Sequence, residues 1–274
     1  MKTGFEPLTV SELKLKAPSI FTGHPAARTS PHRYLFIPTS KVVQILETIG
    51  WLPVFADEKS VRNEQNQGYQ KHVIRFRNFN ESMRTRLDVG DSLVEIVLTN
   101  SHDGLASFNF MAGLFRLVCG NGLIVANGML NDLRVIHSSF NAANVIDVCA
   151  EIINEVPTMA GSINRMREIE LTKPEQVAFA TAAKSIRWND EVDVDVDGLI
   201  RPKRMEDDHN DIWHTFNTIQ ENIIRGGIRT RNARLHRSHS REVKSVDENI
   251  RLNKALWILA ERMVDIKTGA QLSA

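Results

Sequence analysis

The sequence predicts an α+β fold, with an antiparallel meander sheet of four or five strands preceded by one helix and followed by a helical C-terminal half. Two observations carry this prediction. Short β-branched and aromatic runs, separated by turn residues, fill much of residues 51–137. After residue 139 the apolar residues recur instead at the spacing of amphipathic helices. Strands and helices that are segregated along the chain in this way are typical of α+β proteins.

The chain begins with thirty residues rich in proline, threonine, serine and glycine, which we expect to form an extended N-terminal arm or a loosely ordered tail. A helix is predicted next, within the stretch PTSKVVQILETIG (38–50). Thr39 or Ser40 can cap its start, apolar residues follow one face, and Gly50 suits its C-terminal stop.

Five segments after this helix are predicted to form the sheet. They are residues 70–79, 92–101, 105–120, 122–127 and 133–138. The tetrapeptide SHDG (101–104) and the dipeptide NG (121–122) each provide turn chemistry for a hairpin. Strands joined by such short turns pair with their sequence neighbours, which predicts an antiparallel meander.

Helical periodicity returns in four later segments, at about residues 140–168, 172–188, 206–224 and 245–265. The second starts with TKPE, a good helix N-terminus. The predicted organisation is therefore an N-terminal arm (1–30), one domain (31–265) that combines a helix and sheet (31–139) with a helical half (140–265), and a short tail (266–274).

Composition and charge exclude several classes of protein. No apolar run is long enough to span a membrane, and the N-terminus lacks the apolar stretch of a secretory signal. The two cysteines, Cys119 and Cys149, have no metal-type spacing, which is typical of free thiols in a reducing compartment. We therefore expect a soluble, cytoplasmic protein with no membrane partner.

The segment RGGIRTRNARLHRSHSR (225–241) is the most unusual feature of the sequence. Its six arginines contribute +6, yet the whole chain has a formal charge of only +1, so the remaining residues sum to −5. Arginine, unlike lysine, offers a planar fork that binds phosphate through two hydrogen bonds, which favours a polyanionic ligand over a merely soluble loop. A loop of this length between two helices is also typical of a functional segment.

These features predict a nucleic-acid-binding site that contacts phosphates without reading the base sequence. Its candidate residues are Arg225, Arg229, Arg231, Arg234, His236, Arg237, Arg241, Lys203 and Arg204. A secondary basic patch is expected near the sheet, at Arg75, Arg77, Arg84 and Arg86.

Two acidic stretches resemble metal sites. In VDVDVDG (192–198) the aspartates match an EF-hand loop, but Arg204 stands where the bidentate glutamate is required, so we reject an EF-hand. The alternation also fits an edge strand, and an opportunistic cation site stays open. In EDDHNDIWH (206–214), Asp207, Asp211 and His214 share a helix face, as metal ligands do. Acidic residues that stabilise a helix N-terminus explain the same pattern better.

No catalytic signature is present. The sequence has no Walker loop, no GxGxxG between strand and helix, no HExxH and no nucleophile motif. We therefore predict no catalytic residue, no metal and no cofactor.

Several stretches together resemble the phage/plasmid-like protein family, domain-of-unknown-function family 932. They are PHRYLFIPTSKVVQILETIGWLPV, TNSHDG, GLFRLVCGNGLIV, DIWHTFNTIQENIIRGG and SVDENIRLNKALWILAE. The resemblance implies a gene carried by bacteriophages, prophages or plasmids, and hence a bacterial host cell. The family offers no catalytic residues to carry over. Its motif residues here are Arg116, Cys119, Asn121 and Gly122.

The function that we expect is sequence-tolerant binding of single-stranded DNA during phage or plasmid replication or recombination, possible strand annealing included, by a homo-oligomer. The order of a sheet followed by helices is also similar in outline to phage single-strand annealing proteins of the Red-beta type, an analogy of fold alone. Two alternatives stay open. One is an interaction protein whose arginines dock on an acidic host factor, and the other is a metal-dependent nuclease.

Overall fold

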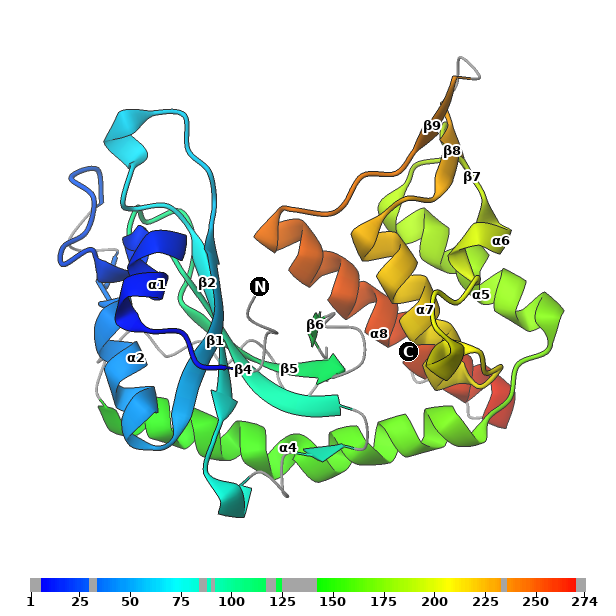
Figure 1. The fold of residues 1–274 in the computed structure, drawn as a ribbon, viewed down its shortest axis with the longest axis horizontal. Helices are drawn as coiled ribbons and strands as arrows, with labels where there is room; N and C mark the ends of the chain where they lie inside the picture. Colours follow the sequence, from blue (N-terminus) through cyan, green and yellow to red (C-terminus); the bar gives the residue numbers. More distant parts are fainter. Residues whose placement is uncertain are drawn as a thin grey trace. The chain divides into compact units, whose positions relative to one another are not determined.

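The structure is a computed structural model and describes residues 6–29, 34–83, 88–89, 92–116, 122–124, 142–232 and 236–269. The chain divides into two compact units, residues 1–156 and 157–274, and the boundary falls inside the long helix α4 (Ala142–Glu168) (Figure 1). The sheet that the sequence predicts lies in the first unit, and helices α5, α7 and α8 lie in the second. Among the described residues, no helix is long and apolar enough to cross a membrane.

The N-terminal unit consists of short helices and a central sheet. Its helical elements before α4 are α1 (Val10–Lys16), η1 (Pro18–Phe21), α2 (Thr39–Thr48) and η2 (Glu64–Asn66). Its strands are β1 (Trp51–Glu58), β2 (His72–Asn78), β3 (Asp88–Val89), β4 (Ser92–Asn100), β5 (Asn109–Arg116) and β6 (Gly122–Ile124).

The sheet is an antiparallel meander, and the predicted α+β class is confirmed. Its strand order is β1-β2-β4-β5-β6, with β3 paired to β4. Four of the predicted segments contain β2, β4, β5 and β6, whereas the fifth, 133–138, lies outside the described residues. Strand β1 was not predicted. It contains Pro53, which cannot donate to a ladder, and the register shifts between Pro53 and Phe55 as in a β-bulge.

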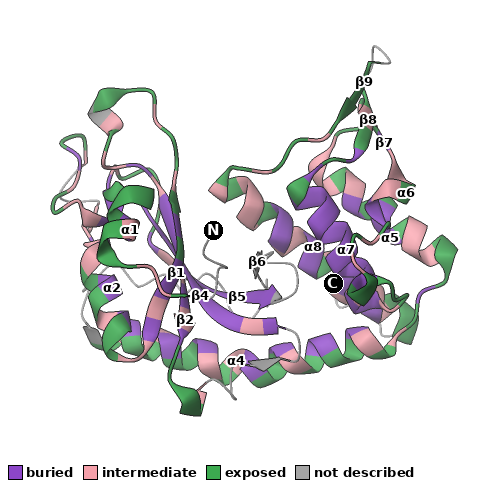
Figure 2. Cartoon of the chain, viewed as in Figure 1, coloured by how far each residue is buried: buried purple, intermediate pink, exposed green. Residues whose placement is uncertain are grey.

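Alternating apolar residues build the core of this unit. Ile74 and Phe76 of β2, and Ile96 and Leu98 of β4, are fully buried on one face of the sheet. Helices α1 and α2 both pack against β1. Figure 2 shows the buried residues concentrated along the strands. The predicted first helix is confirmed as α2, which buries its apolar stripe.

The prediction of an extended N-terminal arm is wrong for the described part of residues 1–30. Thr9 and Glu12 form a reciprocal capping box that starts α1. Leu13, Ala17 and Ile20 are then buried, and the Leu8 N–H donates to the Pro53 carbonyl of β1 at 2.6 Å. The polar composition concealed an i, i+4, i+7 apolar stripe that fastens this segment to the sheet.

The C-terminal unit is mainly helical. Its elements are α5 (Lys173–Arg187), β7 (Asp193–Val194), α6 (Val196–Leu199), η3 (Met205–Asp207), α7 (Ile212–Arg225), β8 (Arg229–Arg231), β9 (Arg237–His239) and α8 (Val246–Thr268). Helices α5, α7 and α8 pack pairwise. Trp213, Phe216 and Trp257 are fully buried, with the Phe216 and Trp257 rings edge to face. The core of this unit therefore lies around α7.

The four predicted helices are present, with one later start. The expected helix at 206–224 begins only at Ile212, because the Asp211 side chain accepts from the His214 N–H and caps α7 there. Residues 205–207 form the separate 3-10 turn η3. At α5 the predicted start signal is confirmed, since Thr172 and Glu175 form a capping box.

The prediction that residues 225–241 form a loop is wrong. Strands β8 and β9 pair as an antiparallel hairpin, and β7 pairs with the other edge of β8, so that the order is β7-β8-β9. The Val–Asp alternation does form an edge strand, although only Asp193 and Val194 belong to it before α6 begins. Residues 225–241 are called the basic hairpin from here on.

Candidate functional site

The register of the small sheet gathers charged side chains on one face. Arg231 lies opposite Asp193 on one side and Arg237 on the other. Arg229 lies opposite His239, and its carbonyl accepts from the Asp195 N–H at 3.0 Å. Because strand residues alternate between faces, each set of three forms a row across the sheet. We call these six side chains the ionic face.

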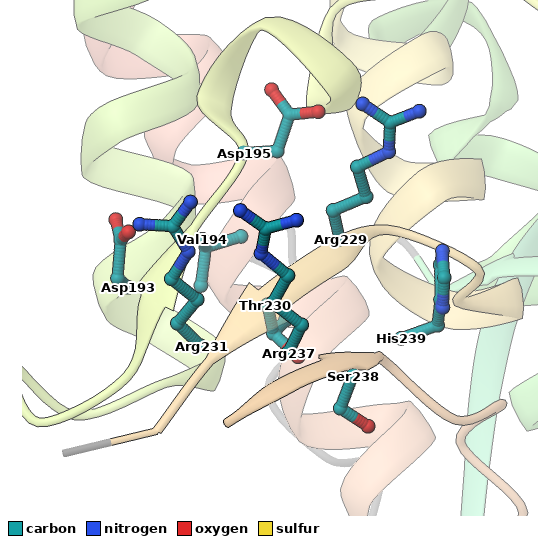
Figure 3. A pocket seen from close by; sticks show the side chains of 9 residues that line it. All are labelled: Asp193, Val194, Asp195, Arg229, Thr230, Arg231, Arg237, Ser238 and His239. Carbon is teal, nitrogen blue, oxygen red and sulfur yellow. The ribbon is translucent and has the colours of Figure 1, made fainter. Parts of the chain in front are cut away.

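Figure 3 shows these side chains projecting to one side of the strands, while Ser238 points to the other. Together with Val194, Thr230 and Ser238, they line an open hollow of about 750 Å³. Val194, which alternates with the charged residues of β7, is buried. The alternating pattern therefore anchors one face of the sheet and leaves the charged face to solvent.

The arginines of the ionic face are exposed and make no side-chain contact with a charged or hydrogen-bonding partner among the described residues. Arg229, Arg231 and Arg237 are all exposed. In the described part of the chain, none of the three guanidinium groups makes a hydrogen bond or an ion pair with another residue. A guanidinium carries five donors, so each arginine keeps its full capacity to bind an anion.

The base of the basic hairpin is held by backbone contacts. The Gly227 N–H donates to the Ser240 carbonyl, and the Ser240 N–H donates to the Ile228 carbonyl, both at 2.8 Å. Gly226 has a φ of +73°, and a Cβ atom there would lie 2.5 Å from the Ser240 carbonyl oxygen. Only glycine fits such a close approach in this conformation.

Arg187 fastens the hairpin to the helices. Its guanidinium donates to the Ile223 carbonyl near the end of α7 and to the Arg241 carbonyl after β9. The same side chain lies over the Trp188 ring, with 4.7 Å between the guanidinium carbon and the ring centroid. The sequence analysis did not identify this residue, because its partners are backbone carbonyls that no side-chain pattern reveals.

Three of the predicted binding residues lie around a carboxylate instead. Arg204 donates to both carboxylate oxygens of Glu221, at 2.6 and 2.7 Å, and Arg225 lies 3.7 Å from the same group. Glu221 also attracts the exposed Lys203. Glu221 itself is buried in α7. This cluster neutralises charge within the protein, and a role in ligand binding for its cations stays a prediction.

The remaining predicted residues are placed as follows. Arg241 and His236 are exposed at the ends of the hairpin strands, whereas Arg234 lies outside the described residues. Of the family motif, Arg116 ends β5 opposite Ser92, and Gly122 begins β6 opposite Phe115. Cys119 and Asn121 lie outside the described residues.

The predicted secondary patch near the sheet is a buried ion cluster where the structure describes it. Arg75 and Arg77 donate to the two oxygens of the fully buried Glu95, at 2.8 and 2.9 Å. The Arg75 guanidinium also stacks on Phe115, 3.3 Å from its ring centroid. Arg84 and Arg86 lie outside the described residues. Arg75 and Arg77 are thus paired in the core, and the prediction of an available patch is wrong for them.

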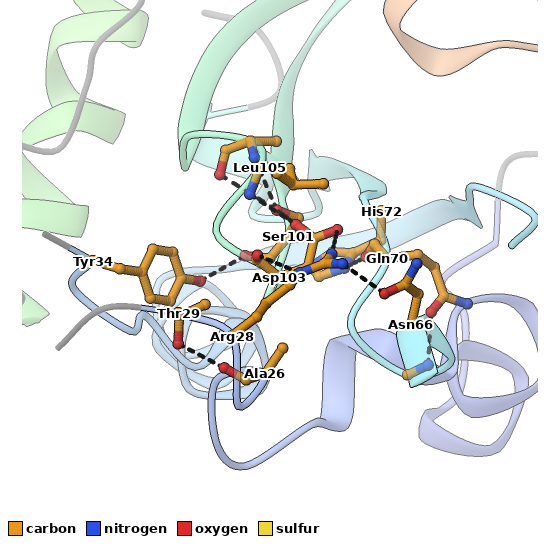
Figure 4. A network of polar contacts seen from close by, with 12 residues as sticks. Ala26, Arg28, Thr29, Tyr34, Asn66, Gln70, His72, Ser101, Asp103 and Leu105 are labelled. Atoms are coloured by element: carbon orange, nitrogen blue, oxygen red, sulfur yellow. Dashed lines mark hydrogen bonds and ion pairs between the residues drawn. The ribbon is translucent and has the colours of Figure 1, made fainter. Parts of the chain in front are cut away.

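A polar network organises the SHDG turn (Figure 4). The Asp103 carboxylate accepts from the Ser101 hydroxyl at 2.7 Å and lies 3.1 Å from the Arg28 guanidinium. The Tyr34 hydroxyl donates to the Ser101 carbonyl at 2.7 Å. Burial, helped by the Asp103 charge, raises the pKa of Tyr34 to about 12. The turn thus connects the N-terminal segment to the end of β4.

Two histidines are buried beside this turn. Thr39 Oγ1 lies 2.9 Å from His72 Nε2 and 3.4 Å from His102 Nε2. Burial lowers the pKa of His72 to about 3, with a further contribution from His102. Burial likewise lowers the pKa of His102 to about 4, against the opposing charge of Asp103. Both imidazoles are therefore neutral at pH 7 and act as uncharged hydrogen-bonding groups of the core.

The acidic stretch at 206–214 serves helix capping and ion pairing. Asp211 caps α7 and pairs with His214 at 2.6 Å, whereas Asp207 lies 3.3 Å from Arg204. In the part of the chain that the structure describes, no group of three histidine, cysteine or acidic residues is arranged to hold a metal ion.

Comparison with known proteins places the chain in a family. No solved structure matches it. It is 36% identical over 259 residues to UPF0380 protein YafZ of Escherichia coli (strain K12), and 35% identical over 259 residues to UPF0380 protein YfjQ of the same strain. Each match covers 94% of this chain and 92% of the relative. Residues 28–257 match the family model described as "Domain of unknown function (DUF932)". The chain therefore belongs to the DUF932 family, which the sequence motifs had indicated.

Proposed function

We propose that the protein binds single-stranded DNA by seating its phosphate backbone on the ionic face, in the replication or recombination of a phage or plasmid. The observation that carries the proposal is a group of exposed arginines, Arg229, Arg231 and Arg237, which form no ion pair with any other described residue. Exposed guanidinium groups can bind phosphate oxygens through two hydrogen bonds each.

The spacing of the arginines suits a repeating anion. Residues two apart on a strand are separated by about 6.6 Å, and neighbouring strands by about 4.8 Å. Arg229 and Arg231 follow one strand, and Arg237 lies beside Arg231 on the next. An extended nucleic-acid backbone presents its phosphates at regular intervals and can follow such a row. A single small anion would need only one of these groups.

The ionic face offers little for reading bases. His239 is its one ring, and among the described residues no tryptophan, tyrosine or phenylalanine lines the hollow. Hydrogen bonds to phosphates fix the position of a strand without selecting its sequence. We therefore expect binding that tolerates all base sequences.

Fluorescence anisotropy with a labelled oligothymidine tests the proposal. Replacing Arg229, Arg231 and Arg237 together by glutamine should weaken binding roughly a hundredfold at low salt, because each lost contact is worth about 1 kcal/mol in water. The matched control replaces Lys16, Lys59 and Arg62 by glutamine, since these exposed cations lie in the other unit. Equal affinity of the two variants would overturn the proposal.

A wild-type protein that binds no DNA at low salt would favour the alternative reading, in which the arginines dock on an acidic protein surface. A pull-down from nuclease-treated bacterial lysate then separates the two. A protein retained by the wild type and lost from the arginine variant would support an interaction protein.

A further inference from the structure

An acidic segment that contains β7 borders the basic hairpin. Residues 189–198, NDEVDVDVDG, contain five acidic residues and no basic one. The structure places two of them on the ionic face, because Asp193 lies opposite Arg231 in the register of β7 and β8, and Asp195 lies next to Arg229. The pairing of β7 with β8 therefore places an acidic segment of the sequence beside a basic one.

Roles in the fold account for only one of the two aspartates on the ionic face. Asp195 caps the short helix α6, accepting from the Gly198 N–H at 3.0 Å. Asp193 makes no ion pair and no side-chain hydrogen bond within the described residues, although it faces Arg231. Aspartate is disfavoured in strands, so a neutral β-branched residue would pair here at lower cost. The charge of Asp193 is thus not required by the fold.

We propose that Asp193 and Asp195 make the ionic face selective for single-stranded over double-stranded DNA. This inference rests on the proposed function. Neighbouring strands lie about 4.8 Å apart, so the backbone at Asp193 and Asp195 stands about 5 Å from that of β8 and about 10 Å from that of β9. The Debye length is about 10 Å at 0.1 M salt, so charges at both spacings still act on each other under that condition.

A DNA duplex brings a higher density of negative phosphate charge near these carboxylates than a single strand does. It carries one negative charge per about 1.7 Å of axis, against one per about 3.4 Å for each strand alone. The three arginines can seat only one backbone at a time. The second backbone brings unneutralised phosphates within reach of Asp193 and Asp195. A single strand has no second backbone and can keep its phosphates over β8 and β9, which lowers the repulsion.

The test compares single-stranded oligothymidine with an oligo(dA)·oligo(dT) duplex of equal length, using wild type and the Asp193→Asn/Asp195→Asn variant. Asparagine keeps the size of the side chain and also caps helices well, so α6 is retained. We expect duplex affinity to rise roughly tenfold, because removing repulsion worth about 1.4 kcal/mol changes an equilibrium tenfold. Single-strand affinity should rise no more than about threefold by the same reasoning, since most of its phosphates lie over the arginines.

A control variant, Asp190→Asn/Glu191→Gln, removes the same charge from the exposed turn before β7. It should leave the ratio of the two affinities unchanged. Equal gains on both DNAs in the test variant, or equal effects of the two variants, would overturn the selectivity while the proposed function stands. Failure of the wild type to bind either DNA would instead overturn the proposed function. If the double variant unfolds, Asp193→Asn alone, which leaves the cap intact, should reproduce about half of the effect on a logarithmic scale.

Discussion

Arginine serves two different purposes in the two units of this protein. In the N-terminal unit, Arg75 and Arg77 share the buried carboxylate of Glu95, and one of them also stacks on a phenylalanine ring. In the C-terminal unit, the arginines of the ionic face are exposed, and none has an assigned partner among the described residues. The same residue type thus lies in the interior of the fold in one place and on an exposed surface in the other. What distinguishes them is burial together with a compensating carboxylate in hydrogen-bonding contact, which Glu95 provides only in the sheet.

The largest effect should come from removing that compensating charge. Glu95→Gln removes the carboxylate that two largely buried guanidinium groups share, and breaking a buried pair in this way costs about 3–5 kcal/mol. Urea denaturation should therefore show a free energy of unfolding lower by about that amount. A loss below about 1 kcal/mol would mean that the two arginines are hydrated and that the contrast between the units is not real.

Acidification should destabilise the N-terminal unit through its histidines. Because the pKa values of His72 and His102 are lowered to about 3 and about 4, the unfolded state binds more protons than the folded state below about pH 6.5. Stability should then fall as the pH drops, by at most about 1.4 kcal/mol per pH unit for each histidine. Denaturation midpoints at pH 7 and pH 5 measure this loss. A His72→Gln/His102→Gln variant that still folds should lose less stability between pH 7 and pH 5 than the wild type. An equal loss in both proteins would contradict the lowered pKa values of the two histidines.

The hairpin depends on its backbone rather than on charge. Gly226→Ala introduces a Cβ against the Ser240 carbonyl and forces a residue other than glycine into a positive φ, at a cost of about 1–3 kcal/mol. Gly227→Ala is the matched control, since Gly227 has a φ of +84° but open space around it. Hydrogen exchange of the β8 and β9 amides should accelerate more in the first variant than in the second. The reverse order would show that the close approach does not hold the hairpin.

The smallest effect on stability is expected for the hairpin arginines themselves. Substitutions at exposed positions without partners usually change stability by about 0.5 kcal/mol or less. The Arg229→Gln/Arg231→Gln/Arg237→Gln variant should therefore unfold almost as the wild type does. A loss above about 2 kcal/mol would reveal structural partners and make these arginines resemble those of the sheet.

The sequence predicted much of the fold because its signals were local. Helix stripes and caps, such as the capping box at Thr172, and strand alternation in β4 depend on nearby residues. Strand β1 was not predicted because Pro53 and the bulge interrupt the alternation of apolar and polar residues. The N-terminal helical segment was not predicted because its buried apolar residues, Leu13, Ala17 and Ile20, are surrounded in the sequence by polar residues.

The candidate site was predicted only in part, because charge pattern does not reveal partners far along the chain. Arg75 and Arg229 look alike as sequence, yet only the first meets a glutamate on a neighbouring strand. Asp193 and Arg231 are separated along the chain by α6, η3 and α7 before the sheet joins them. The alternation of Val and Asp indicated a strand, but it contained no signal that this strand would pair with β8.

The central claim is that the unpaired arginines of the hairpin bind phosphate, and the salt dependence of single-strand binding tests it most directly. Each phosphate neutralised by a cation contributes about −0.7 to the slope of log affinity against log salt concentration. Replacing Arg229, Arg231 and Arg237 by glutamine should therefore make the slope shallower by about 2. The Lys16/Lys59/Arg62 control should keep the wild-type slope. Parallel lines for wild type and the arginine variant would contradict the account, because they would place the phosphates elsewhere.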